Sequence, residues 1–297
     1  MPERKDPKTK KRHTSEGGGG GSHPITILER CKSVTLTGYI MFINGIHLIN
    51  AISIHIKFMT AEHIANSDLS TLQESIRQVK QVYMQRGFKL TNILMDGQFG
   101  CIRGNLVELH INLNIFSNDE HVGEIDQLNH TVKERDRGVY NMLPFNKLPG
   151  RMIIELVALV IFWIKVLPTS PSVGGNLSTH QITTSLTIND MKHCRPQFST
   201  YAQFHKSHDN TMQERTTGAI SLWPTGNAQG AYFFMSLTTG QILNRQSFTP
   251  LPLPQDVINS VHHLVRRNPK GLDIRNRDQH LFLEPEDGAN NDDDDST

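Results

Sequence analysis

The sequence predicts an α/β fold in which helices flank a mixed β-sheet, followed by a small β-rich C-terminal unit. Two observations lead to this prediction. Strand-like and helical patterns alternate over the first part of the chain, as they do in proteins whose helices cover a sheet. From about residue 196 onward, short strand-like runs follow one another with turns between them, which is typical of an all-β unit.

The first strands form a predicted hairpin. In "YIMFINGIHLINAI", Asn44-Gly45 stands between two apolar, β-branched runs, which is the strongest short sequence signal for a hairpin. Both runs are apolar at consecutive positions, so both faces of the sheet should be covered.

A helix and two further strands follow the hairpin. Strands are expected over 89–95 ("KLTNILM") and around 113–116 ("LNIF"). Gly87 suits the position just after a helix, because glycine tolerates a positive φ there. The helix before it is indicated by an apolar stripe of Leu72, Ile76, Val79 and Tyr83.

The next helix is expected over 119–140, because a Ser-Asn start precedes acidic residues in its first turn. One face carries Val122, Ile125, Asn129 and Val132. A proline-containing loop then leads to an apolar helix over 151–166. Its apolar run is too short to span a bilayer and has Glu155 and Lys165 at its flanks, so a buried helix is expected and no membrane contact.

The C-terminal unit contains the strand-like runs "GAISLW", "AYFFMSL" and "QILNRQSF", and "DVINSVHHLVRR" is expected to close it as a helix. The predicted organisation is a disordered basic, Gly-rich arm (1–23), the α/β core (34–168), a linker (169–195), the β-rich unit (196–267) and a disordered acidic tail (271–297).

Charge is distributed unevenly although the formal net charge is only +1. The body, residues 24–270, has 22 basic and 17 acidic residues, which suits a polyanionic partner. The N-terminal run "KTKKR", Lys8 to Arg12, resembles a nuclear-import patch. The polar N-terminus and three widely spaced cysteines predict no signal peptide and no disulfide framework, so an intracellular protein is expected, with nuclear import as one option.

Asp96 follows the strand over 89–95 directly, in "NILMDGQFG". A carboxylate at the end of a buried strand is costly unless it is paired or binds a metal, although Asp before Gly is also a common turn start. Polynucleotidyl transfer needs such carboxylates, because they hold two divalent ions that clamp the attacking and leaving oxygens of a phosphodiester. Asp96 is therefore a candidate metal ligand.

The helix over 119–140 can supply a further acid. Asp126 lies on one helical stripe with His130, Lys133 and Arg137, and cations along the same face suit a phosphate backbone. Glu124 is the alternative, although no cation follows on its own stripe until Arg135.

Four blocks of the sequence resemble the integrase region of copia-type retrotransposon polyproteins. They are "IMFINGIHLINAISIHIKFMTAE", "GFKLTNILMDGQFGCIRG", "LNIFSNDEHVGEIDQLNHTVKER" and "RTTGAISLWPTGNAQGAYFFMSLTTGQILNRQSFTPLPLP". The resemblance runs from about residue 34 to residue 267. It implies an RNase H-like core with a triad of acids that binds Mg²⁺ or Mn²⁺, DNA as partner, assembly as a homo-oligomer and no small-molecule substrate.

In this resemblance Asp96 matches the second acid and Asp126 matches the helix acid, which is normally Glu. The first acid falls on Tyr39. A phenol is uncharged near neutral pH and a poor ligand for Mg²⁺, which prefers charged oxygens. Asp in place of Glu withdraws a carboxylate by about one ångström, and a misplacement of that size can cost about a hundredfold in rate. The segment between Asp96 and Asp126 is also shorter than is usual in the wider superfamily.

The sequence therefore predicts an integrase-like protein for DNA integration whose polynucleotidyl transferase or nuclease site is degenerate, with Asp96 and Asp126 as metal ligands. His130, Lys133 and Arg137 are the predicted nucleic-acid contacts. The alternative is a non-enzymatic DNA-binding remnant or an interaction module reused by the host. The target site, the oligomeric state and the role of the β-rich unit are open at this level.

Overall fold

The computed structural model describes residues 24–64, 69–116, 123–167, 177–205, 212, 215–267, 274–275 and 281–282. The predicted N-terminal arm lies outside these residues. So does the predicted acidic tail, apart from β11 (Ile274–Arg275) and β12 (Leu281–Phe282), which pair with each other. None of the described helices is long and apolar enough to cross a bilayer.

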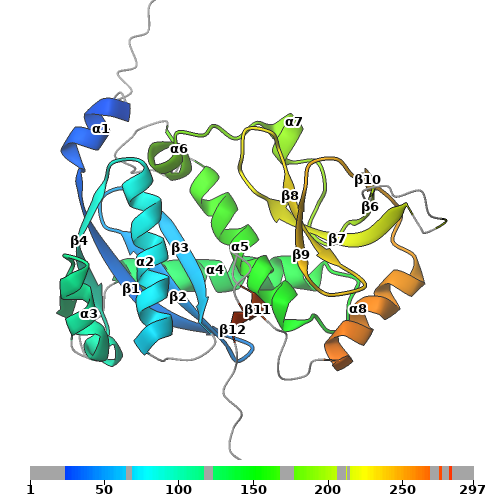
Figure 1. Ribbon diagram of the computed structural model, residues 1–297, viewed down its shortest axis with the longest axis horizontal. Helices are drawn as coiled ribbons and strands as arrows, with labels where there is room; N and C mark the ends of the chain where they lie inside the picture. The colour runs from blue at the N-terminus through cyan, green and yellow to red at the C-terminus, as the bar shows by residue number, and fades with distance from the viewer. Residues whose placement is uncertain are drawn as a thin grey trace, which may run out of the picture.

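A five-stranded mixed sheet forms the first half of the molecule (Figure 1). The strand order is β3-β2-β1-β4-β5, with β2 antiparallel to β1 and β3, and with β1, β4 and β5 mutually parallel. This arrangement confirms the predicted mixed sheet. The strands are β1 (Ser33–Ile43), β2 (Ile46–Ser53), β3 (Met59–Ile64), β4 (Lys89–Met95) and β5 (Asn112–Ile115).

The predicted turn at Asn44-Gly45 joins β1 to β2. Both residues have positive φ, at 51° and 80°, and this is the conformation that a two-residue hairpin with the right-handed strand twist requires. The turn fixes the β1–β2 register, with Ile43 opposite Ile46 and Tyr39 opposite Asn50.

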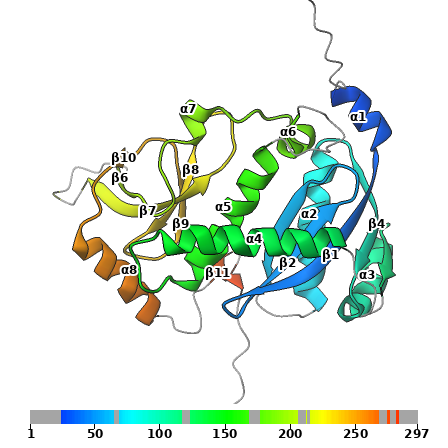
Figure 2. The same ribbon diagram turned by 180° about the vertical axis from the view of Figure 1, so that it is seen from behind.

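Helices cover both faces of this sheet (Figures 1 and 2). On one face α2 (Leu69–Gln85) buries its predicted stripe of Leu72, Ile76, Val79 and Tyr83, and Gly87 follows with φ of 90°. On the other face, α4 (Gly123–Asn141) packs on β1 and β2. The short elements at the sides are α1 (Pro24–Arg30), the 3₁₀ helix η1 (Gly97–Ile102) and α3 (Arg103–Glu108).

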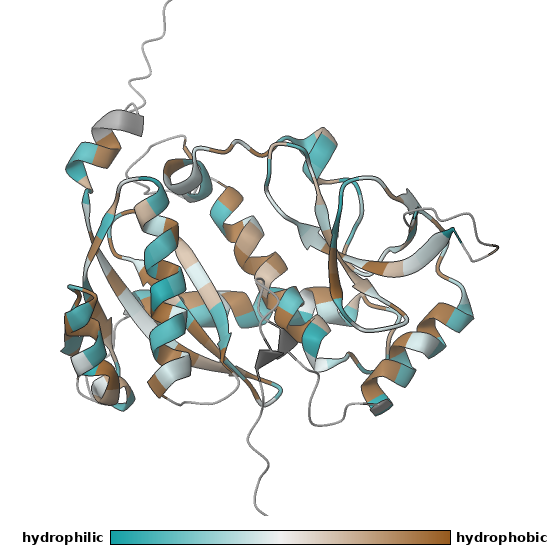
Figure 3. Ribbon diagram, viewed as in Figure 1, coloured by the Kyte–Doolittle hydropathy of each residue, from teal (hydrophilic) through white to brown (hydrophobic). Residues whose placement is uncertain are grey.

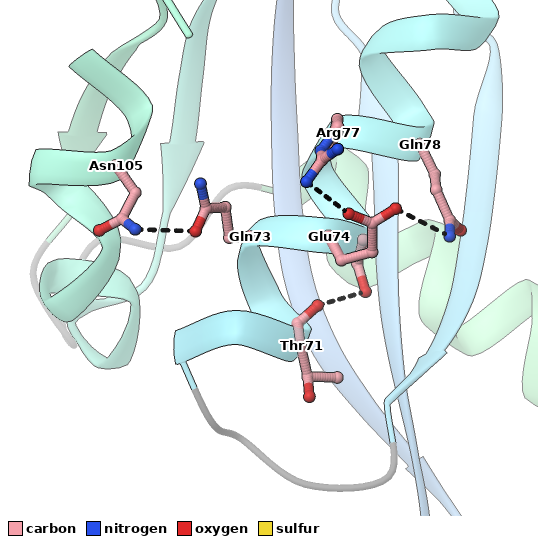
Figure 4. Close-up of polar contacts among 7 residues, drawn as sticks. Thr71, Gln73, Glu74, Arg77, Gln78 and Asn105 are labelled. Atoms are coloured by element: carbon pink, nitrogen blue, oxygen red, sulfur yellow. Dashed lines mark hydrogen bonds and ion pairs between the residues drawn. The ribbon is translucent and has the colours of Figure 1, made fainter. Parts of the chain in front are cut away.

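The solvent side of α2 carries a small polar network, shown in Figure 4. Glu74 accepts from Arg77 at 3.1 Å and from Gln78 at 3.5 Å, so its carboxylate serves both neighbours on the helix. Asn105 of α3 donates to Gln73 at 2.7 Å and thereby ties α3 to α2.

The apolar helix α5 (Gly150–Val166) lies between the two halves of the molecule, and it is one of the most hydrophobic segments in Figure 3. It packs on β3 of the first sheet and on β7 of the second. This position explains why it is apolar around most of its circumference. Arg151 and Glu155 form a buried ion pair at 2.9 Å, and the Trp223 indole N–H donates to Glu155 at 2.7 Å, so the buried charges are compensated.

The predicted β-rich unit is a five-stranded antiparallel sheet in the order β10-β6-β7-β8-β9. The helix α8 (Gln255–Arg267) closes it, with Val257, Val261 and Leu264 in the same core cluster as residues of β7 and β8. The strands are β6 (Tyr201–His205), β7 (Thr216–Pro224), β8 (Tyr232–Ser236), β9 (Ile242–Arg245) and β10 (Thr249–Pro250).

The predicted linker over 169–195 differs from what the structure shows at residues 177–195. Two short helices, α6 (Thr179–Thr184) and α7 (Asp190–His193), lie there. Ile182 belongs to the core cluster beneath α2, and both ring nitrogens of buried His193 lie 2.8 Å from backbone carbonyl oxygens. Residues 177–195 therefore pack against the rest of the protein through Ile182 and His193, a contact that composition alone does not predict.

Candidate nucleic-acid interface

The structure places Tyr39 and Asp96 on neighbouring strands. Thr37 of β1 is paired with Leu94 of β4 in the parallel register, so two residues further along each strand bring Tyr39 level with Asp96. Because side chains alternate along a strand, both positions belong to the face that carries Thr37 and Leu94. Tyr39 is 36 % exposed, and Asp96 is half-buried, so this part of the face opens to solvent.

Asp96 lies between the last residue of β4, Met95, and the first residue of η1, Gly97. Its carboxylate accepts a hydrogen bond from the Gly97 N–H and so caps the 3₁₀ helix. Asp96 thus serves as the turn-starting residue that its position before glycine predicts, and it also stands at the strand end that a metal-binding role requires.

A part-buried hydrogen bond ties α4 to this face. Asn50, which is opposite Tyr39 on β2 and fully buried, donates from Nδ2 to Asn129 Oδ1 of α4 at 2.8 Å. Asp126 lies three residues before Asn129, almost one helical turn away, and is exposed. The structure thus brings Tyr39, Asp96 and α4 to one region of the sheet, with Asp126 on the adjoining turn of the helix.

Glu124 is directed elsewhere. It forms an ion pair with Lys57, which lies in the turn between β2 and β3. In the strand order β3-β2-β1-β4-β5 this turn is separated from β4 by β1. The position of its partner favours Asp126 over Glu124 as the helix acid near Asp96.

The donor set does not fit a two-metal centre. Two-metal catalysis uses several carboxylates around the ions, and here the position on the first strand holds the phenol of Tyr39. Among the described residues, no three His, Cys, Asp or Glu side chains come together where an ion could bind. Tyr39, Asp96 and Asp126 together provide two carboxylates, and no third carboxylate joins them in a possible metal site among the described residues.

The predicted nucleic-acid contacts follow Asp126 along α4. His130 and Arg137 are exposed, and Lys133 is half-buried. Arg137 donates to Glu134 on the same helix, which offsets part of its charge. From Asp126 to Arg137 the helix rises by about 16 Å, or about 1.5 Å per residue, so the stripe leads away from the acids toward the far end of the β1–β2 hairpin.

A cavity of about 420 Å³ lies at that far end, between the tip of the β1–β2 hairpin, the second half of α4 and the first half of α5. The view in Figure 2 shows these three elements crossing one another. The apolar wall consists of Phe42, Ile43, Ile153, Leu156 and Val157, and the polar lining of Asn44, Lys133, Asp136, Arg137 and Tyr140.

Asp136 is the unusual residue of this lining. It is only 5 % exposed, and neither of its carboxylate oxygens has a hydrogen-bond partner among the described residues. Burial raises the pKa of this carboxyl to about 7, because removal from water disfavours the charged form. Asp136 is therefore poised between the acid and the carboxylate near neutral pH.

The sequence reasoning missed both Asn50 and Asp136. A signal for Asp136 was available, because it follows buried Val132 by four residues and so falls on the apolar stripe of α4. Asn50 carried a weaker signal, as a single amide inside the apolar run of β2. A polar residue on an otherwise buried face indicates a hydrogen bond or a site, and for Asn50 the partner is Asn129.

No protein-family model matches the chain. No curated protein sequence matches it either.

Solved structures of two retroviral integrase domains resemble it. The catalytic core domain of BIV integrase is 11 % identical, with 51 % of this chain and 93 % of that domain aligned and a TM-score of 0.38. The HTLV-2 integrase catalytic core domain was solved in complex with magnesium in a trimeric form. It is 14 % identical, with 50 % of this chain and 95 % of that domain aligned and a TM-score of 0.38. At these identities and TM-scores, no residue role or activity of this chain follows from the likeness.

The α/β part of the fold prediction is confirmed by the described elements, which form a mixed sheet in the order β3-β2-β1-β4-β5 with helices on both faces. The RNase H-like integrase and copia-type assignments stay predictions.

Proposed function

We propose that this protein is a nucleic-acid-binding, integrase-like protein of copia-type retrotransposon origin whose strand-transfer chemistry is impaired. The observation that supports the proposal is the nearness of Tyr39, Asp96 and α4 on one sheet face, with Tyr39 at the position where the family resemblance expects the first carboxylate. DNA is the proposed partner, a homo-oligomer the proposed assembly, and the inside of the cell, with nuclear import, the proposed location.

Binding and catalysis have different requirements at this face. Duplex binding needs cations that displace counterions from phosphates, and Lys133 and Arg137 supply them without any metal, with His130 beside them as a further polar contact. Catalysis needs a complete set of carboxylates around divalent ions, and no group of three such ligands comes together among the described residues. These residues support DNA binding more than strand transfer, which favours a DNA-binding remnant over an active enzyme.

Replacing Lys133 and Arg137 together by Ala should lower the affinity for duplex DNA at least about tenfold at low salt. The slope of log K against log salt concentration should become shallower by about 1.8, because each lost phosphate contact removes about 0.9 from it. Gel-shift titrations at several salt concentrations measure both quantities.

The matched control is Arg77→Ala with Lys89→Ala. It removes the same charge from exposed residues on α2 and at the start of β4, away from α4. Equal losses of affinity in the two double variants would mean that binding follows overall charge and that α4 is not the interface.

A further inference from the structure

We infer that the cavity beside Asp136 is a pocket for one unpaired nucleobase of the bound strand, with guanine preferred. The inference rests on the proposed function, since it names the part of a nucleic acid that this end of α4 would recognise.

The volume and walls suit a base. Pockets for small organic groups measure about 300–1,000 Å³ and are mostly apolar with a few polar groups, and this cavity of about 420 Å³ has that composition. Phe42 is 54 % exposed, an unusual position for a phenylalanine at the rim of a cavity. An exposed aromatic ring is the surface on which an unpaired base stacks.

The charges select a ligand that carries both an anion and hydrogen-bond donors. Lys133 and Arg137 in the lining attract a phosphate, whereas the carboxyl group of Asp136 has no hydrogen-bond donor within the described part of the chain. A simple cation would meet two like charges, and a simple anion would leave the carboxylate unpartnered. A nucleotide satisfies both, since its phosphate faces the cations and the N–H groups of its base reach the acid.

Guanine is the base that suits a carboxylate best. Its N1–H and N2–H₂ groups lie side by side and can donate to both oxygens, whereas thymine has a single N–H. A bidentate pair of this kind discriminates between bases, because the wrong base leaves one carboxylate oxygen without a donor. Because the oxygens of Asp136 are closed off from bulk water, base binding includes a rotation of this side chain toward the cavity.

The pocket lies further along the stripe that begins at Asp126. Lys133 and Arg137 belong to both features, since they are predicted phosphate contacts and also line the cavity. A strand that follows α4 from Asp126 would therefore reach the pocket within about 16 Å of helix.

Titration of the full-length protein with dGMP, dCMP, dAMP and dTMP tests the inference, with isothermal titration calorimetry as the measurement. We expect dGMP to bind most tightly and dTMP most weakly. Asp136→Asn should weaken dGMP binding at least about tenfold, the change that about 1.4 kcal/mol produces, and dTMP binding much less. Lys133→Gln should weaken all four by a similar factor, because they share the phosphate.

The ratio of dGMP to dTMP affinity should also rise between pH 6 and pH 8, since only the ionised carboxylate accepts both donors. The phosphate titrates equally in both nucleotides and cancels in this ratio. Lys133, Arg137 and Tyr140 are the other titratable residues of the lining, all on α4, and the hairpin and α5 contribute no charged residue to it.

Equal affinities for the four nucleotides, or an Asp136→Asn variant with an unchanged ratio, would overturn the base pocket. So would the absence of binding up to about 10 mM, which corresponds to a standard free energy of only about −3 kcal/mol. A parallel gel-shift with duplex DNA separates the two proposals. Duplex binding without nucleotide binding refutes the pocket alone, and loss of both refutes the proposed function as well.

Discussion

Asp136→Asn should make the protein more stable at pH 8 by about 2–4 kcal/mol, which is unusual for the substitution of a buried residue. Burial raises the pKa of Asp136 from 3.8 to about 7, and every tenfold change in proton affinity between the folded and unfolded states corresponds to about 1.4 kcal/mol. Asparagine has nearly the same shape and never becomes charged, so the variant avoids burying a carboxylate that has no hydrogen-bond partner among the described residues.

The direction in which stability changes with pH follows from which state, folded or unfolded, binds the proton more tightly. The folded state holds the Asp136 proton more tightly than the unfolded state, so the parent loses stability as the pH rises from about 4 to about 7 and then stays level. His63 and His180 act in the opposite direction. Burial lowers the pKa of each to about 4, so their contribution is complete above about pH 6.5 and is lost as the pH falls toward 4.

Urea unfolding at several pH values, for the parent and for Asp136→Asn, isolates the effect of the aspartate, because the histidines contribute equally to both proteins. The difference between them should be near zero at pH 4 and largest at pH 8. Asp256→Asn, an exposed acid in the first turn of α8, is the matched control and should change stability by less than about 1 kcal/mol. A constant difference across the pH range would show that Asp136 binds its proton equally tightly in the folded and unfolded states, so that burial does not raise its pKa.

The second large effect is the restoration of chemistry. Tyr39→Asp with Asp126→Glu should produce metal-dependent nicking of DNA that the parent lacks, because three carboxylates would then surround the region beside Asp96. Each single change should do little, since groups that act as a unit are not additive. Mn²⁺ should support more activity than Mg²⁺, whose coordination geometry is more demanding.

Relaxation of supercoiled plasmid in either metal measures this activity. The matched control is Tyr39→Asn with Asp126→Gln, which has the same side-chain sizes without the carboxylates. If the repaired variant binds DNA but stays inert in both metals, ligand loss is not a sufficient explanation. The short segment between Asp96 and Asp126 would then be the next candidate.

Local signals in the sequence were sufficient to predict most elements of the first sheet and its helix α2. The Asn44-Gly45 turn, the stripe of α2 and the run from Lys89 to Met95 each follow from a rule that involves only neighbouring residues. The strand β3 was missed, because the pattern of "MTAEHI" is weak and it becomes a strand only by pairing with β2. The helices α6 and α7 were missed for a related reason, since helices of four to six residues depend on tertiary packing.

The features of the candidate site also fall into two groups, those that neighbouring residues predict and those that depend on contacts between distant residues. The end of a strand before a glycine identified Asp96, and helical spacing grouped Asp126 with the cations of α4. The separation of Glu124 from this group depends on an ion pair with Lys57, which lies 67 residues earlier in the chain. The cavity at Asp136 depends on three elements that meet only in the folded protein, so its volume and its exclusion of water were beyond the reach of sequence patterns.

The most direct test of the central claim is a gel-shift titration of the unmodified protein with duplex DNA, in EDTA and in Mg²⁺ or Mn²⁺ at constant ionic strength, with the DNA afterwards examined for cleavage. If the chain retains a cationic interface and lacks a complete metal site, binding should be equally tight with and without metal, should weaken with added salt, and should leave the DNA uncut. Binding that requires the divalent ion, or cleavage of the DNA by the unmodified protein, would contradict the claim.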